Sequence, residues 1–192
     1  MATFWSSFAV AKSITIGQQL AESHLKERKL TMENILGTTR YVNIVARTII
    51  VDCTKSIEEM IADNHYNWVH YNITVRRFPI ACASLGEWEC DLYFPNRLLS
   101  SESVLKGMKS DDKDNLWIPA RLEHILAFDG KTTNEQYRYP IVALGSVGDV
   151  HGNLRVPYLS KDIAGKRLCL GCYDDGWLSD FRFLRVRKAQ KP

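Results

Sequence analysis

The stretch RYVNIVARTIIVD, residues 40–52, says more about the fold than any other part of the chain. It is dense in β-branched residues, and its apolar positions are too continuous for a half-exposed helix, so we predict a largely buried strand. Thr54 is then a candidate N-cap for a short helix over residues 55–63, followed by a second strand over residues 67–77. This order predicts a β-α-β unit with a crossover long enough for parallel pairing, and a third strand between the two remains an alternative.

Similar patterns predict further elements on both sides of this unit. They are a helix over residues 13–29 with Ser13 as candidate N-cap, a strand over 88–94 ended by Pro95, a helical segment over 95–108, and a helix from Pro119 to about Gly130. The polar segment KSDDKDN, residues 109–115, predicts a loop. We expect a single domain over residues 1–192, with this loop as the candidate internal boundary.

The second half of the chain has a different composition. Glycine becomes frequent, and short β-prone runs cover residues 137–144, 153–158, 166–173 and 177–188. Asp175 and Gly176 stand between the last two runs and predict a two-residue type I′ hairpin turn. The predicted fold class is therefore α+β, with an N-terminal helix and β-α-β portion followed by a β-rich, hairpin-containing C-terminal half.

Composition excludes several classes of protein. The 192 residues are 45% hydrophobic and 24% charged, which is ordinary for a globular domain with its own core. The longest apolar runs are far shorter than the roughly 18 residues that cross a bilayer. The N-terminal apolar stretch is interrupted by Ser6 and Ser7 and has no basic residue before Lys12, unlike a secretory signal. We expect a soluble, cytoplasmic protein without a membrane partner.

The five cysteines are an odd number and are scattered along the chain, which predicts free thiols. Cys169 and Cys172 have the spacing of half a zinc site, and Cys82 with Cys90 could supply the other half. In a strand, however, Cys169 and Cys172 would point to opposite faces, so we expect no metal and no other cofactor.

The segment GDVHGN, residues 148–153, resembles the first metal-binding motif of calcineurin-like metallophosphoesterases. In that family a strand end supplies an Asp and a His to a two-metal site, so the resemblance implies Asp149 and His151 as metal ligands of a phosphoesterase. It covers six residues, the family's later GD-x-x-D and GNH blocks do not appear, and no histidine follows His151. We therefore expect a glycine-rich turn in which Asp149 bonds its own backbone.

The segment FRFLRVRKAQK, residues 181–191, interleaves aromatic and basic side chains, as nucleic-acid-binding surfaces do. Residues 177–192 hold five Lys or Arg and one Asp, so the positive charge of the chain is concentrated here. The candidate nucleic-acid-binding residues are Arg182, Arg185, Arg187 and Lys188. The alternative is an edge strand that buries its aliphatic residues and keeps its arginines in solvent.

No pattern points to a catalytic residue. The segment LGSVG, residues 144–148, lacks the glycine two positions before the serine that a nucleophile elbow requires, and His65 and His70 flank Trp68 in a setting typical of packing. The leading hypothesis is a non-catalytic interaction or structural protein, alone or within a larger assembly, whose partner is another protein or a second copy. The alternatives are a nucleic-acid-binding protein and a metal-dependent phosphoesterase.

Overall fold

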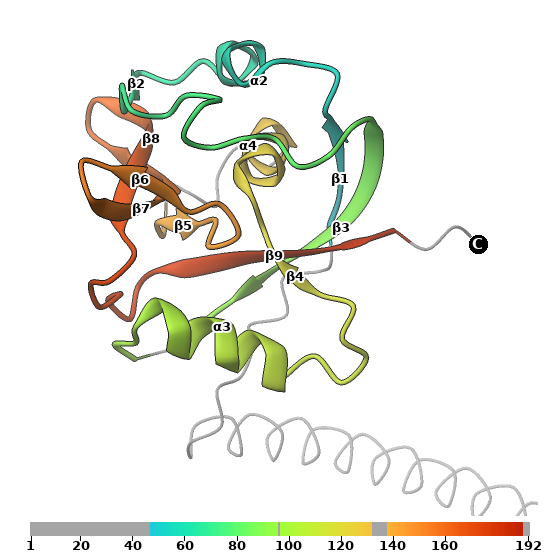
Figure 1. Ribbon diagram of the computed structural model, residues 1–192, viewed down its shortest axis with the longest axis vertical. Coiled ribbons are helices and arrows are strands. Elements are labelled where there is room, and N and C mark those ends of the chain that lie inside the picture. Colours follow the sequence, from blue (N-terminus) through green and yellow to red (C-terminus); the bar gives the residue numbers. More distant parts are fainter. Residues whose placement is uncertain (1–46, 96, 132–137, 190–192) are drawn as a thin grey trace, which may run out of the picture. The chain divides into compact units, whose positions relative to one another are not determined.

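The computed structural model describes residues 47–95, 97–131 and 138–189 (Figure 1). The chain divides into two units, Met1–Arg40 and Tyr41–Pro192, and every described residue belongs to the second. The predicted helix over residues 13–29, and residues 40–46 of the predicted first strand, lie outside the described residues.

The described part of the chain forms one mixed sheet of nine strands with three helices. The strands are β1 (Arg47–Asp52), β2 (Trp68–Val69), β3 (Leu85–Tyr93), β4 (Ile118–Pro119), β5 (Ile141–Val142), β6 (Gly148–Val150), β7 (Asn153–Asp162), β8 (Gly165–Cys172) and β9 (Arg182–Lys188). The helices are α2 (Ile57–Asp63), α3 (Ser101–Ser110) and α4 (Leu122–Lys131). The strand order is β1-β3-β9-β5-β7-β8-β2, with β4 on β9 and β6 on β7. The predicted α+β class with a strand-rich C-terminal half is confirmed.

Helix α4 lies between β1 and β8, with α2 above it and α3 on the other side of β9 (Figure 1). Its apolar positions Leu122, Ile125 and Leu126 are fully buried and pack with Ile49 of β1 in the main core. A second core forms beneath α3 around Trp177. None of the described helices is long and apolar enough to cross a membrane.

Strand β9 is an interior strand. It pairs with β3 on one side, and with β4 and β5 on the other. Residues 182–186 are all buried, because a strand with partners on both sides and layers on both faces has no face left for solvent. The prediction of a solvated edge strand is therefore wrong.

The type I′ hairpin turn is at a different place from the predicted one. Strands β8 and β9 are not neighbours, and neither Asp175 nor Gly176 has a positive φ. Trp177 instead exchanges backbone hydrogen bonds with Leu99, which buries its indole and turns the chain away from β8. Positive φ values occur at His151 (57°) and Gly152 (80°), the two residues between β6 and β7.

The predicted succession of strand, helix and strand is present as β1, α2 and β2, but the two strands do not pair with each other. Strand β1 pairs antiparallel with β3, whereas β2 pairs parallel with β8, so the two lie at opposite ends of the sheet. Only Trp68 and Val69 of the predicted second strand are extended, since hydrogen-bonded turns follow them over residues 70–78.

The helix between these strands exists, but Ser56 caps it. Ser56 and Glu59 form a capping box, whereas the hydroxyl of Thr54 donates to Asp52 Oδ1. Helix α4 likewise begins at Leu122, since Pro119 belongs to β4.

The polar segment 109–115 is the end of α3 and the turn after it, and its side chains are exposed except that of Asp112. Helix α3 continues to Ser110, and the largely buried Asp112 accepts a hydrogen bond from the Trp117 amide at 2.7 Å. The strands on both sides of this segment belong to the same sheet.

Candidate functional site

A pocket of about 480 Å³ opens between the segment before β3, the end of β9 and the start of α4. Its volume falls in the range of ligand sites, roughly 300–1,000 Å³. Leu85, Trp88 and Ile118 supply apolar surface, and Leu85 is 63% exposed. The polar lining comes mainly from Arg121, Glu123 and His124, around the first turn of α4, and from Lys188 of β9.

The sequence of α4 explains why polar side chains lie below the surface here. Leu122 and Ile125 anchor the helix in the core, and Glu123 and His124 between them are drawn inward to 1% and 2% exposure. An acidic residue in the first turn is also favoured by the helix dipole. Two titratable groups are thus held at the base of the pocket.

Glu123 leaves half of its carboxylate without a partner. Its Oε1 atom accepts hydrogen bonds from the Ala81 amide and from Arg121 Nε, both at 3.2 Å. Its Oε2 atom is buried and has no hydrogen-bond partner among the described residues. A buried acceptor without a partner costs about 1–3 kcal/mol, so this atom is a strong acceptor for a bound group.

His124 offers the complementary donor. Its Nδ1 atom accepts a hydrogen bond from the Arg121 amide at 3.1 Å, so we assign the proton of the neutral ring to Nε2. Burial, together with the nearby Arg121 charge, lowers the pKa of His124 to about 4. The ring meets Trp88 edge-on, with 4.6 Å between centroids, and its Nε2 atom has no partner in the described part of the chain.

Two basic side chains, Arg121 and Lys188, line this pocket, and they differ in their bonding partners. The guanidinium of Arg121 bonds Glu123 and also donates to the Pro79 carbonyl at 2.8 Å. Lys188 is exposed, and its Nζ atom lies 5.4 Å from the centre of the Trp88 ring with no carboxylate partner among the described residues. Lys188 therefore carries the uncompensated charge of the lining.

A disulfide joins Cys53, just after β1, to Cys82 in the pocket wall. Their Cα atoms are 5.7 Å apart, a usual separation for a disulfide. The prediction that none of the five cysteines forms a disulfide is wrong for this pair, whereas Cys90, Cys169 and Cys172 form no disulfide. The two bonded cysteines are 29 positions apart in the sequence, a separation that matches no recognisable motif.

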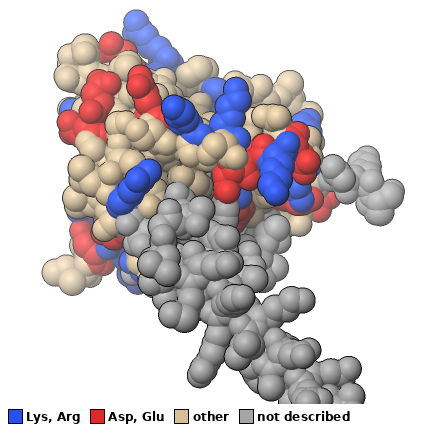
Figure 2. All heavy atoms as spheres, turned by 90° about the horizontal axis from the view of Figure 1, so that it is seen from below, with Lys and Arg blue, Asp and Glu red and all other residues tan. Residues whose placement is uncertain are grey.

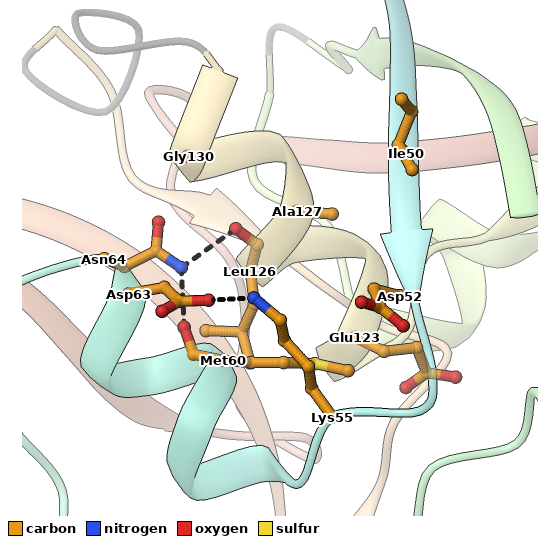
Figure 3. Close-up of a pocket in the computed structure, with 10 residues that line it drawn as sticks. All are labelled: Ile50, Asp52, Lys55, Met60, Asp63, Asn64, Glu123, Leu126, Ala127 and Gly130. Atoms are coloured by element: carbon orange, nitrogen blue, oxygen red, sulfur yellow. Dashed lines mark hydrogen bonds and ion pairs between the residues drawn. The ribbon is translucent and has the colours of Figure 1, made fainter. Parts of the chain in front are cut away.

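Glu123 also lines a second, smaller pocket of about 160 Å³ between β1, α2 and α4. Figure 3 shows Lys55 reaching to Asp63, which it bonds at 2.6 Å, while Asp52 lies at the same end as Glu123. This volume is below the range of ligand sites. The larger pocket is the better candidate.

The GDVHGN segment forms strand β6, the β6–β7 turn and the first residue of β7. Asp149 Oδ1 accepts from the Gly152 amide at 2.9 Å, which confirms the predicted turn. Asp149 and His151 are both exposed. In residues 47–95, 97–131 and 138–189, no three His, Cys, Asp or Glu side chains are arranged to hold a metal ion.

The two cysteines of the predicted half zinc site lie in β8, three residues apart. At that spacing their side chains point to opposite faces of the sheet. Cys169 is buried, 3.5 Å from the Ser160 hydroxyl, and Cys172 is partly exposed.

The predicted nucleic-acid residues share β9, but two of them are paired with acids of β3. Arg185 binds Asp91 through Nε and Nη2 at 3.0 and 2.7 Å, and Arg187 binds Glu89 at 2.8 and 2.6 Å. Both guanidinium groups also lie within 5 Å of the Trp117 ring centre. On the face seen in Figure 2, basic and acidic atoms are interspersed.

Arg182 is engaged in another way. Its guanidinium stacks on Phe94 and Tyr139, 3.3 and 3.9 Å from the ring centres, and donates to three backbone carbonyls. Of the four predicted residues, Lys188 is the exposed one. Nucleic-acid binding remains a prediction to which this geometry adds little.

Sequence reasoning missed Glu123 and His124. The apolar positions of α4 were recognisable, and two titratable residues between Leu122 and Ile125 were the available signal. Their burial depends on how α4 packs between the strands, which no local pattern contains. Searches against protein-family models, curated proteins and solved structures found no match to this chain.

Proposed function

We propose that this protein is a non-catalytic binding protein that recognises a partner through the pocket beside the Cys53–Cys82 disulfide. The observation that carries the proposal is the pair Glu123 and His124. Each is almost completely buried, and each leaves one polar atom without a partner in the described residues at a pocket of ligand size. A purely structural core gains nothing from such atoms, because each costs stability.

The same two side chains argue for binding over proton transfer. The pKa of His124 is lowered to about 4 by burial, which is far from the near-neutral pKa that suits a general acid or base at pH 7. Its ring is also fixed by the Arg121 amide and by Trp88. A neutral, fixed imidazole is suited to donate one hydrogen bond to a bound group.

The pocket wall is held in place before any partner arrives. The segment 79–82 is held at the start of α4 by hydrogen bonds from Arg121 to the Pro79 carbonyl and from the Ala81 amide to Glu123. The disulfide joins it to Cys53, just after β1. A preformed wall reduces the ordering cost of binding. This supports a recognition site more than an accidental surface hollow.

The test is a protein-observed NMR screen of the full chain with a fragment library of small carboxylic acids, amines and neutral amides. We expect at least one chemical class to shift the Trp88 indole and the His124 amide together. Ala83→Trp should fill the pocket from its exposed rim and abolish these shifts, whereas the control Ala164→Trp, on an exposed turn outside the pocket, should preserve them. No shift with any class would refute the proposal.

A further inference from the structure

We infer that the occupant of this pocket is the C-terminus of a polypeptide, recognised by its carboxylate, its last backbone N–H and an apolar last side chain. The inference rests on the proposed function and names the partner group. Four features of the lining carry it: a free cation, a fixed donor, a free acceptor and an apolar wall.

The charge balance of the lining favours an anion. Arg121 and Glu123 compensate each other through the 3.2 Å contact between Nε and Oε1, which leaves the positive charge of Lys188. The Nε2–H of His124 is a further donor without a partner among the described residues. A carboxylate accepts from both kinds of donor, and such charge-assisted bonds are the stronger ones.

A simple anion would leave one acceptor of the site without a hydrogen-bond donor. The Oε2 atom of Glu123 needs a donor, and a bare carboxylate offers none and would be repelled by it. A polypeptide C-terminus carries an N–H next to its carboxylate, so it offers a donor and acceptors in one group. Capture of a C-terminal carboxylate is a recurring mode of peptide recognition.

The apolar wall accounts for the last side chain. Leu85 and Ile118 are 63% and 42% exposed beside the pocket, and Trp88 adds an aromatic surface. An apolar side chain would cover them and remove their surface from water. The volume of about 480 Å³ is at the lower end for ligand sites and suits the last one or two residues.

The same chemistry occurs in a free amino acid, in which an ammonium replaces the amide N–H. We commit to the polypeptide because its C-terminus carries one negative charge, which balances the charge of Lys188, whereas a zwitterionic amino acid would leave that charge uncompensated. The experiment separates the two sources.

The experiment measures fluorescence anisotropy of N-terminally labelled hexapeptides that end in valine, leucine or phenylalanine, each as a free acid and as a C-terminal amide. We expect at least one free acid to bind the full chain and its amide to bind at least tenfold more weakly. Lys188→Gln should weaken the free acid severalfold, whereas Lys106→Gln, exposed on α3, should not.

The other possible results distinguish failure of the inference from failure of the proposed function. Equal binding of acid and amide, or fragment binding without any peptide binding, overturns the inference and leaves the proposed function standing. Free leucine that competes as well as the peptide overturns the polypeptide source. If neither the peptides nor the fragments bind, the inference and the proposed function are both refuted.

Discussion

The carboxylate of Glu123 accepts a hydrogen bond from the Ala81 amide, which joins the first turn of α4 to a segment 42 residues earlier in the chain. The same Oε1 atom accepts from Arg121, whose guanidinium reaches the Pro79 carbonyl. One buried carboxylate therefore fixes both the base and the wall of the pocket.

Removing this carboxylate should destabilise the fold. Glu123→Ala leaves the Ala81 amide and the Arg121 guanidinium without their shared acceptor, for which we expect a loss of about 2–3 kcal/mol. Glu123→Gln keeps an acceptor oxygen and should lose less. Urea unfolding measures both, and an Ala variant within about 0.5 kcal/mol of the parent would contradict this role.

The disulfide should be directly countable. Denatured protein, never exposed to reductant, should titrate three thiols, and five after reduction. Closing a loop of 29 residues stabilises the fold by about 3–4 kcal/mol in the chain-entropy estimate. Reduction should lower the free energy of unfolding by a similar amount, and a Cys53→Ser, Cys82→Ser variant should show no further loss with reductant.

Two basic residues of β9 should respond differently to loss of charge. Arg185→Gln leaves the carboxylate of Asp91 without its partner in a site where the side chains are 8% and 13% exposed, so we expect a cost of about 3 kcal/mol. Lys188→Gln removes an exposed charge and should cost less than about 0.5 kcal/mol. Equal melting temperatures for the two variants would mean that β9 is solvated.

His124 should make the fold sensitive to mild acid. Burial lowers its pKa from 6.5 to about 4. As the pH falls, this imidazole is therefore protonated below about pH 6.5 in the unfolded chain, but only below about pH 4 in the folded chain. Stability is therefore lost as the pH falls through this window, by about 2 kcal/mol between pH 7 and pH 5.

The control for this pH effect is His124→Phe. Burial lowers the pKa of His70 as well, so the difference between parent and variant is the relevant quantity. Denaturant unfolding at both pH values gives it. If the two proteins lose the same stability on acidification, His124 is not the group responsible.

The β6–β7 turn can be tested against the turn that the sequence favoured. Gly152 has a φ of 80° and no neighbour within 4 Å of an added Cβ, so Gly152→Val acts on the backbone alone. We expect a cost above about 1 kcal/mol, because β-branched residues tolerate positive φ poorly. Gly176→Val, at an ordinary φ, should cost less in the same thermal unfolding assay, and the reverse order would contradict the structure.

Local patterns predicted which segments are extended or helical, but not which strands are neighbours. The β-branched residues before Asp52 indicated a strand, and β1 is one, yet its partner β3 is reached only after the whole 53–84 segment. Strand pairing over such distances depends on how all the elements pack together, which no single window of sequence contains.

Turns and caps failed for a related reason. Asp175 and Gly176 have the composition of a type I′ turn, but burial of Trp177 against the Leu99 segment outweighs that local preference. The spacing of Ser56 and Glu59, by contrast, is that of a capping box and could have been recognised in the sequence, but Thr54 was predicted as the N-cap. The pocket was beyond prediction, because it combines three separate segments of the chain.

The central position of β9 sets an order of events during synthesis on the ribosome. Every strand that β9 connects precedes it in the sequence, so β1 and β3 on one side and β5, β7 and β8 on the other emerge first as two separate groups. They become one sheet only after residue 188 has left the exit tunnel. Until then β3 and β5 expose unpaired edges, the kind of surface that molecular chaperones protect.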